Sequence, residues 1–392
     1  MKIVHICLGC FYIDNYSYQE NMLPKFHKQM GLDVEIIAST LSFDENGNAC
    51  NIEPRVYLNE YGIKVTRLAY KKYIPSRIAK FLRIYEGFSA ALENAKPNII
   101  FVHGCQFCDI RIIVEYEKTH NITIYVDNHA DFSNSATNWL SKNILHKGLW
   151  RYCAHLIEPY TKMFYGVLPV RVDFLKNIYK LPKDKCQLLV MGADDELVEK
   201  AKENGARETV RFRYGINSGD FLIITGGKID RWKTQTLLLM EAVHKIHRSD
   251  VKLLVFGSVT EDLKSKIEKL ADGHVVQFIG WVKSCDSYEL FEAADLVVFP
   301  GRHSVMWEQV VGQGIPIVVK DWPGTHHVDL GGNVCYLEND SVSGIQDTLN
   351  RIISQPDVYN DMKKAAQKKG LKEFSYKEIS KRSIDLEMRE LL

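Results

Sequence analysis

The sequence lacks the long apolar runs, the strong charge of one sign and the leader that would mark several classes of protein. No uninterrupted apolar stretch reaches the ~18 residues that a membrane-crossing helix needs. The first residues, Met1–Ile6, are typical of a β-strand rather than of a secretory signal peptide. The net charge of +1 argues against a nucleic acid as partner. We therefore expect a cytoplasmic protein.

Cysteine is present in an odd number, nine, without a secretory signal, which indicates a reducing compartment. Four of the cysteines form two Cys-x-x-Cys pairs, Cys7–Cys10 and Cys105–Cys108, each at the end of a predicted strand. Two such pairs could bind zinc, but their separation in the chain is unlike that of a compact zinc ribbon. Cysteine is also a common small buried residue, so we expect buried thiols rather than a metal site.

The apolar content is that of a globular enzyme. Hydrophobic residues make up 46% of 392, enough for ordinary cores in two or three domains. Near the start, a strand to about Leu8, a helix from about Tyr18 to Met30 and a strand at Val34–Ala38 predict a βαβ unit. The fold class expected is therefore α/β.

The most informative segment is residues 295–319. Two short β-branched runs in it flank a polar loop and a stretch with helical spacing. Loops at the carboxyl ends of parallel strands form the crevice where ligands bind. Glu308 lies in the predicted helix. Its carboxylate is either a dipole-stabilised surface charge or the acceptor for two ribose hydroxyls, and this segment alone leaves both interpretations open.

A second segment, residues 221–240, favours the ribose interpretation. It contains a hydrophobic strand, a turn at Gly227, the cations Lys228 and Lys233, and then a helical stretch. Glycine lets a phosphate approach the backbone, and lysine supplies a point charge to it. Together the two segments predict a nucleotide diphosphate held between two loops of one sheet.

These two segments resemble the motifs of a family 4 glycosyltransferase, which has the GT-B fold and acts with retention on nucleotide-sugar donors. In that family a Gly-Arg-Leu-x-x-x-Lys-Gly loop binds the donor diphosphate. Residues 227–234 match its spacing, with Lys for Arg and Thr for the last Gly. The family's Glu-Ala-Met-Ala-x-Gly-x-Pro-Val is similar to Glu308–Ile317, which has one inserted residue. The resemblance implies two Rossmann-like parallel-sheet domains that face each other across a donor-binding cleft.

One departure from the family pattern concerns the donor sugar. The family has two glutamates separated by seven residues, and here Pro300 stands in place of the first. The stretch that follows is shortened to Gly301–Ser304. The glutamate that meets the ribose is kept, and the one that meets the sugar is not. The resemblance places Ser304, Val305, Glu308 and Gly280 in the donor site, the last in the loop that holds the base.

The first half of the chain carries the remaining candidates. In the family a glycine after the first strand lets the reaction centre approach the backbone, and Gly9 has this place; a plain tight turn is the alternative. A family histidine touches the donor sugar, and His129, after the predicted strand at Ile122–Val126, fits that position better than His103. A helix cap or an ordinary loop histidine is the competing account.

The resemblance also implies the division of the chain. We expect an acceptor-side domain over 1–195, a nucleotide-sugar-binding domain over 196–373, and a C-terminal helix, 374–392, that returns to the first domain. The charged run Asp194–Arg213 has no strand pattern and leads to a second domain that starts near Gly219.

The implied activity is retaining transfer of a hexose from a UDP-sugar to a glycan or polyprenyl-linked acceptor in surface-polysaccharide synthesis. His129, Lys228 and Lys233 are the catalytic candidates. No Asp-x-Asp motif accompanies them, so we expect no metal and no cofactor. Two alternatives remain, namely a GT-B epimerase or phosphorylase, and a non-catalytic nucleotide-sugar-binding module.

Two basic, aromatic stretches, residues 70–92 and 142–151, bear on localisation. A basic amphipathic helix can lie on an anionic membrane surface, although such helices more often cover a sheet. Five cations in the first stretch, together with Phe81 and Trp150, predict a peripheral association with the inner face of the cell membrane. The five cations are Lys71, Lys72, Arg77, Lys80 and Arg83.

Overall fold

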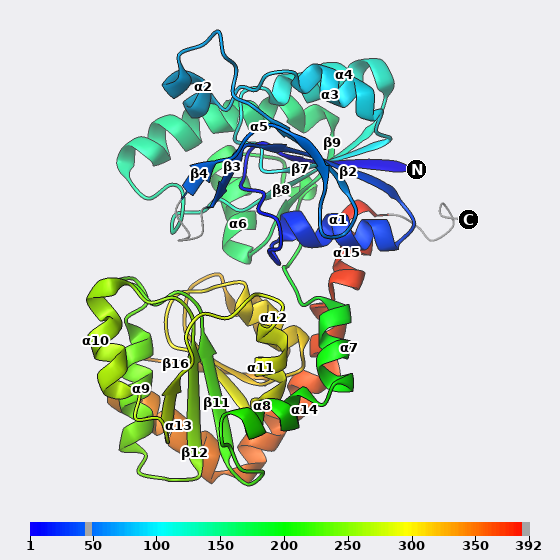
Figure 1. The fold of residues 1–392 in the computed structure, drawn as a ribbon. Helices are drawn as coiled ribbons and strands as arrows, with labels where there is room; N and C mark the ends of the chain where they lie inside the picture. Colours follow the sequence, from blue (N-terminus) through cyan, green and yellow to red (C-terminus); the bar gives the residue numbers. More distant parts are fainter. Residues whose placement is uncertain (44–48, 386–392) are drawn as a thin grey trace. The chain divides into compact units, whose positions relative to one another are not determined.

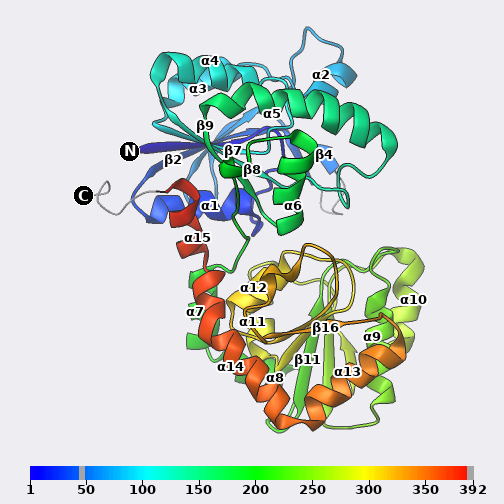
Figure 2. The ribbon, with the colours of Figure 1, turned by 180° about the vertical axis from the view of Figure 1, so that it is seen from behind.

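The computed structural model describes residues 1–43 and 49–385, which divide into two compact units, each an α/β body around a mainly parallel sheet (Figures 1 and 2). Unit 1 holds the described residues up to Val190 and from Ile379 on, and unit 2 holds Met191–Glu378. The first boundary was expected after residue 195 and lies after residue 190. The second was expected after residue 373 and lies after residue 378. The reason for the difference is backbone pairing within unit 2, where Ala193 N–H donates to Phe374 C=O at 2.7 Å.

The sheet of unit 1 has eight strands in the order β10-β9-β8-β7-β1-β2-β6-β5, all parallel except β5. The strands are β1 (Lys2–Cys7), β2 (Asp33–Ser39), β5 (Val56–Leu58), β6 (Lys64–Leu68), β7 (Ile99–His103), β8 (Thr123–Asn128), β9 (Thr161–Gly166) and β10 (Cys186–Leu188). A separate antiparallel pair is formed by β3 (Leu41–Phe43) and β4 (Ala49–Asn51). The chain leaves β1 on one side and resumes at β7 on the other, so the topological switch point lies between these two strands.

Helices cover both faces of this sheet (Figure 1). The helices of unit 1 are α1 (Gln19–Gln29), α2 (Ser76–Leu82), α3 (Phe88–Ala95), α4 (Ile110–His120), a π-helical segment (Ser141–Trp150), α5 (Arg151–Ile157), α6 (Pro169–Phe174) and a second π-helical segment (Leu175–Tyr179). Short 3₁₀ turns occur at Glu158–Tyr160 and Lys183–Lys185. The large apolar core lies on the side of α3, α4 and α5, where Val4, Ile6 and Val102 contribute.

The opposite face of this sheet is aromatic and polar, and the C-terminal helix α15 (Tyr376–Ile384) docks on it. His5 pairs with Phe101 across β1 and β7, and Phe101 pairs with Tyr125 across β7 and β8. These three side chains therefore lie side by side on one face of the sheet. The Tyr125 hydroxyl donates to Ile384 C=O at 2.6 Å, and the Tyr165 hydroxyl donates to Arg382 C=O at 3.2 Å. These bonds satisfy carbonyls that a helix end leaves without intrahelical partners.

The sheet of unit 2 has six parallel strands in the order β13-β12-β11-β14-β15-β16. The strands are β11 (Phe221–Gly226), β12 (Val251–Phe256), β13 (Val276–Phe278), β14 (Leu296–Phe299), β15 (Ile317–Lys320) and β16 (Val334–Leu337). Because the first strand of the series lies beside the fourth, this is the Rossmann order 3-2-1-4-5-6, with its switch point between β11 and β14.

The helices of unit 2 lie on both faces of this sheet. They are α7 (Asp195–Glu203), α8 (Ala206–Arg213), α9 (Gln235–Lys245), α10 (Glu261–Leu270), α11 (Ser287–Ala293), α12 (Met306–Gly312), α13 (Val342–Ser354) and α14 (Pro356–Glu373), with a 3₁₀ turn at His326–Val328. The charged run Asp194–Arg213, in which the sequence showed no strand pattern, forms α7 and α8. Asp194 caps α7, and Arg211 donates to the Asp295 carboxylate at 2.5 Å, so this run packs into unit 2.

Candidate functional site

The switch point of unit 2 brings together the two segments that the sequence singled out. The carboxyl ends of β11 and β14 are adjacent there, because Ile223 and Ile224 pair with Leu296 and Val297. The loops that leave these two strand ends contain Gly227 and Gly301 respectively. A crevice at such a point is where open parallel sheets bind their ligands.

Glycines line this edge because the backbone crosses itself closely. Gly227 and Gly257 have φ values of +115° and +135°, which side chains other than glycine rarely adopt. A Cβ on Gly257 would lie 1.9 Å from the Gly227 carbonyl oxygen. The Gly257 N–H also donates to the Gly280 C=O at 2.7 Å. The candidates Gly227 and Gly280 therefore belong to one continuous stretch of the sheet edge.

Lys233 is the cation that reaches this edge. A methyl group placed on Gly227 would lie 3.9 Å from Lys233 Nζ and 3.9 Å from Met306 Sδ, at the start of α12. Burial lowers the pKa of Lys233, and Arg302 lowers it further, while Asp230 opposes the shift. Lys228, by contrast, is exposed. The structure thus places Lys233 at the strand ends and Lys228 outside them.

The loop before α12 is fixed by its own contacts. Arg302 lies over the Trp232 ring at 4.7 Å, which ties the β14 loop to the β11 loop. Trp307 N–H donates to Ser304 C=O at 3.0 Å, and Val305 is the residue before the helix. The N-terminus of α12 is the other group here that could contact an anion. Because this helix has only seven residues, we regard Lys233 as the better-supported anion contact.

Glu308 is fully buried and is held by two imidazoles. Its Oε1 lies 2.8 Å from His303 Nε2 and 2.8 Å from His327 Nε2. Burial alone would raise the pKa of Glu308, but the two histidines outweigh it and lower the pKa to about 2. Glu308 Oε2 and His327 Nδ1 are buried without a hydrogen-bond partner. A dipole-stabilised surface carboxylate is therefore excluded, and Oε2 is free to accept a hydroxyl.

The trio His303, Glu308 and His327 has ligand atoms within 4.8 Å of one another, as a metal site requires. Histidines that bind metals donate their second ring N–H to a carboxylate or carbonyl. His327 Nδ1 has no such acceptor. The arrangement fits an ionised carboxylate held by two N–H donors better than a metal site.

The switch point of unit 1 carries the remaining candidates. Gly9, after β1, meets Gly104, after β7; a Cβ on Gly9 would lie 2.3 Å from the Gly104 carbonyl oxygen. The Arg83 guanidinium donates to the Gly9 carbonyl and, at 2.9 Å, to that of Gln106. Glycine is required at position 9 by this close approach of two loops.

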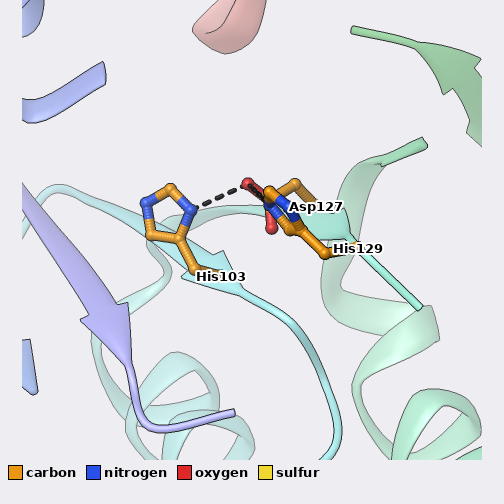
Figure 3. Close-up of side chains that lie close together, drawn as sticks. All are labelled: His103, Asp127 and His129. Carbon is orange, nitrogen blue, oxygen red and sulfur yellow. Dashed lines mark hydrogen bonds and ion pairs between the residues drawn. The ribbon is translucent and has the colours of Figure 1, made fainter. Parts of the chain in front are cut away.

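Beside this crossing, His103, Asp127 and His129 converge from the ends of β7 and β8 (Figure 3). Asp127 Oδ2 lies 2.7 Å from His103 Nδ1 and 3.3 Å from His129 Nε2. The Glu20 carboxylate lies 3.8 Å from His129 Nε2. Asp127 Oδ1 is buried without a partner. The structure brings His103 and His129 together around a carboxylate that the sequence reasoning passed over.

The charges of this group are coupled. Burial opposes the imidazolium of His103, but Asp127 outweighs it and raises the pKa of His103 to about 9. Burial likewise opposes the Asp127 carboxylate, and His103 and His129 hold its pKa well below the ordinary value. The pKa of His129 is raised by Glu20 and Asp127 against the effect of burial. The site therefore carries an ion pair at neutral pH.

The two Cys-x-x-Cys pairs do not form a joint site. All nine cysteines are free, and among the described residues none belongs to a metal-ligand cluster. Instead, Cys7 interacts with Cys10, and Cys108 with Cys153. Cys7 and Cys105 are buried, as expected, whereas Cys10 and Cys108 are half-buried.

Two residues of the expected membrane surface are not available to it. Trp150 is 5% exposed, and Arg83 lies over its ring at 5.5 Å while donating to backbone carbonyls. Tyr73, at 92%, and Phe81, at 53%, are exposed on and before α2. Exposed apolar side chains in the second stretch and beside it are Trp139, Leu140, Ile144 and Tyr152. No helix in the part of the chain that the structure describes has the length and apolar character for crossing a bilayer.

Asp127, His303 and His327 were missed as site residues for different reasons. Asp127 lies near the end of β8, the strand that His129 follows, so its place at a strand end was a usable signal. His303 stands in the shortened loop where the family pattern fails. His327 comes from a 3₁₀ turn nineteen residues after Glu308, and nothing in its sequence surroundings predicts that contact.

Comparison with known proteins agrees with this architecture. Residues 206–369 match the family model described as "Glycosyl transferases group 1". An uncharacterized glycosyltransferase of Methanocaldococcus jannaschii is 23% identical over 222 residues, which are 54% of this chain and 55% of that protein. The match thus spans about half the length of this curated relative.

Among solved structures, a glycosyltransferase from Rickettsia africae has a TM-score of 0.69 at 15% identity and covers 98% of this chain and 97% of its own. UDP-GlcNAc 2-epimerase from Neisseria meningitidis, bound to UDP-GlcNAc, has a TM-score of 0.63 at 13% identity and covers 98% and 99%. The predicted fold class, α/β with two parallel-sheet units of the GT-B fold, is confirmed.

Proposed function

We propose that the chain is a retaining, family 4-type glycosyltransferase that takes a hexose from a UDP-sugar. The observation that carries the proposal is the placement of Lys233 Nζ against Gly227 and the start of α12, at the switch point of a Rossmann-ordered sheet. Transfer leaves a diphosphate, and a fixed cation in a partly dry site stabilises its developing charge. Lys233 would act there without a divalent ion or another cofactor.

Glu308 would hold the nucleotide through its ribose. Its Oε1 is saturated by two imidazoles, so the carboxylate cannot rotate away, and Oε2 is buried and needs a donor. A ribose hydroxyl supplies one. Ser304, Val305 and Gly280 would contact the phosphate and the base from the adjoining loops, and Lys228 would approach from its exposed position.

In unit 1 the group of Asp127 and His129 would meet the sugar. Asp127 Oδ1 lacks a partner while Oδ2 is held, so a sugar hydroxyl completes its hydrogen bonding. Gly9 belongs to the same strand-end loops. The acceptor would be a glycan or a polyprenyl-linked carrier of cell-surface polysaccharide.

Nucleotide binding tests the proposal. UDP should raise the melting temperature by mass action, and uridine should raise it less, because the diphosphate contact is missing. Lys233→Met should remove most of the difference between the two ligands. Lys266→Met, at an exposed site on α10, is the matched control. Equal shifts by UDP and uridine in the wild type would refute the diphosphate site.

A second candidate, a nucleotide-sugar epimerase, is favoured by one observation. The ion-paired Asp127 and His103 with His129 form an acid–base group, and proton transfer at a sugar carbon needs one. Turnover of a UDP-sugar to its epimer without any acceptor would select this function. Release of UDP only when an acceptor is added would select the transferase.

We also propose that the protein associates peripherally with the cytoplasmic face of the membrane through unit 1. Tyr73, Ile78 and Phe81 are exposed beside the exposed cations Lys72, Arg77 and Lys80. Apolar side chains with interleaved cations suit the interface of an anionic leaflet. A polyprenyl-linked acceptor would be met there.

A further inference from the structure

A row of histidines runs through the interior of unit 1 from the strand-end site to α15. His103 Nε2 lies 3.0 Å from His5 Nδ1, and His5 Nε2 lies 3.0 Å from His27 Nδ1. All three imidazoles are fully buried. They come from β7, β1 and α1 respectively, so three separate elements align their rings.

The ends of the row are acceptors. At one end His103 Nδ1 faces Asp127 Oδ2 at 2.7 Å. At the other, His27 Nε2 faces the Ser380 carbonyl oxygen at 3.1 Å and Ser383 Oγ at 2.9 Å. The Ser383 hydroxyl can also donate to the Ser380 carbonyl, 2.7 Å away. Each link in the row needs one proton, since a hydrogen bond has one donor.

Counting protons gives the charge of the row. If the Ser383 hydroxyl donates to the Ser380 carbonyl, His27 Nε2 must be a donor as well. The row then has four links, one from Asp127 to His103, two between histidines, and one from His27 to the serines. Each link needs one proton, so four protons are required. Three neutral imidazoles carry three. One histidine is then an imidazolium. His103 is the favoured carrier, because it alone of the three faces a carboxylate.

A neutral arrangement also exists. If the Ser383 hydroxyl turns to donate to His27 Nε2, the serine supplies the fourth proton and every imidazole is neutral, with each N–H directed toward Asp127. This arrangement sets His27 Nε2 and the Ser380 oxygen, two acceptors, against each other at 3.1 Å. The protonated arrangement is therefore preferred until its extra proton is removed.

We propose that His27, His5 and His103 form a proton relay that stores one proton beside Asp127 and couples it to the hydrogen bond of Ser383 in α15. Loss of the proton reverses the donor and acceptor in two histidine–histidine links and in the His27–Ser383 link, with no change in the covalent framework. His5 and His27 are positioning residues that act through His103.

The neighbouring charged and titratable groups favour the stored proton. Glu20 on α1 and Cys7 on β1 raise the pKa of His103, as Asp127 on β8 does. Arg171 on α6 is paired with Asp131, which limits its opposing effect on His129. Burial lowers the pKa of His5 and that of His27, the latter to about 4, so both remain neutral.

The consequence for the site is that the protonated His103 balances the negative charge of the Asp127 carboxylate. Asp127 can remain ionised although buried, with Oδ1 free for a ligand hydroxyl. This use of the relay in sugar chemistry rests on the proposed function, whereas the relay itself is observable without any ligand.

The experiment is a pH titration of the full chain, selectively ¹⁵N-labelled at histidine, by two-bond ¹H–¹⁵N NMR. Signals are assigned with single histidine variants, and the exposed His274 is the reference. At pH 7 we expect both nitrogens of His103 to be protonated and His27 to carry its proton on Nε2. A neutral His103 at pH 7 would overturn the proposal.

Serine variants test the coupling to α15. Ser383→Ala removes the donor of the neutral arrangement and should move the His103 titration to higher pH. Ser354→Ala is the control, since Ser354 Oγ donates to a helix carbonyl at 2.5 Å with no histidine involved. Equal titrations in wild type and Ser383→Ala would overturn the coupling. Nucleotide binding by unit 2 is measured separately, so failure of the relay and failure of the proposed function can be told apart.

Discussion

At the scale of single residues, Glu308 shows how a side chain can be prepared for one partner. Its Oε1 is committed to His303 and His327, and its Oε2 is buried and unpartnered. We expect Glu308→Gln to weaken UDP binding by about 1.5–3 kcal/mol, the range for hydrogen bonds to a charged group. Calorimetric titration measures it. Glu268→Gln, at an exposed position on α10, is the matched control. An unchanged affinity in folded Glu308→Gln would remove the ribose role.

Lys233 carries the second prediction at this scale. If its charge stabilises the leaving diphosphate, Lys233→Met should lower turnover by about a hundredfold or more, as loss of a charge-stabilising contact commonly does. Addition of EDTA should leave turnover unchanged, since a lysine takes the place of a divalent ion. Lys266→Met should behave as wild type. Strong inhibition by EDTA, reversed by a divalent cation, would show that the charge is supplied differently.

The ion pair of His103 and Asp127 predicts a pH dependence of stability. The folded-state pKa of His103, about 9, is above its ordinary value of 6.5, so its contribution is complete below pH 6.5 and is lost as pH rises through 9. We expect the free energy of unfolding to fall by on the order of 1–3 kcal/mol over this window. Urea unfolding at pH 6.5 and pH 9 measures it. A drop of the same size in Asp127→Asn would assign it to other groups.

What could be predicted at the residue scale follows from position in the chain. Lys233 and Glu308 are recognisable because each stands at a fixed distance from a strand end. His103 and His129 are recognisable for the same reason. His5 and His27 are not, because a histidine within a strand or helix has no pattern that distinguishes a relay from ordinary packing. Their alignment depends on the register of β1 against β7, which is a property of the folded sheet.

At the scale of elements, strand and helix placement followed from periodicity, and most predicted strands lie within about two residues of the observed ones. Val34–Ala38, for example, lies inside β2 (Asp33–Ser39). The run Asp194–Arg213 has no strand pattern, and in the fold it is helical. Val198, Ala201 and Val210 are buried there, as is Arg211, which pairs with Asp295.

The docking of α15 gives a prediction at this scale. The Tyr125 hydroxyl donates to Ile384 C=O, so Tyr125→Phe removes this hydrogen bond and keeps the aromatic ring. We expect a loss of about 1 kcal/mol in the stability of unit 1, a typical net value for such a bond. Hydrogen exchange of the α15 amides should quicken in parallel. Tyr152→Phe, at an exposed tyrosine on α5, is the control and should change neither quantity.

At the scale of the whole molecule, composition and charge predicted a globular enzyme, and the resemblance predicted the fold. The surface could not be predicted to the same extent. Trp150 and Arg83 belong to basic and aromatic stretches, yet they pack on each other, because sequence pattern does not show which face of a helix meets the core.

The membrane proposal is tested on the residues that are exposed. Wild-type protein should sediment with vesicles that contain anionic lipid, with about 1 kcal/mol from each cation near the surface, and binding should fall from low to physiological salt. Replacing Lys72, Arg77 and Lys80 by Gln should abolish it. Replacing Lys266, Lys269 and Lys364, which are exposed in unit 2, should not. Equal sedimentation with neutral and anionic vesicles would leave a water-soluble acceptor as the better proposal.

The return of the chain to unit 1 has a consequence for the order of events during synthesis. The hydroxyls of Tyr125 and Tyr165 and the Nε2 of His27 find their partners in residues 380–384. A ribosome must therefore complete unit 2 before the buried polar face of unit 1 can be closed. Domains commonly fold as they emerge, amino-terminal first. In this chain the unit that is made first is the last to become complete.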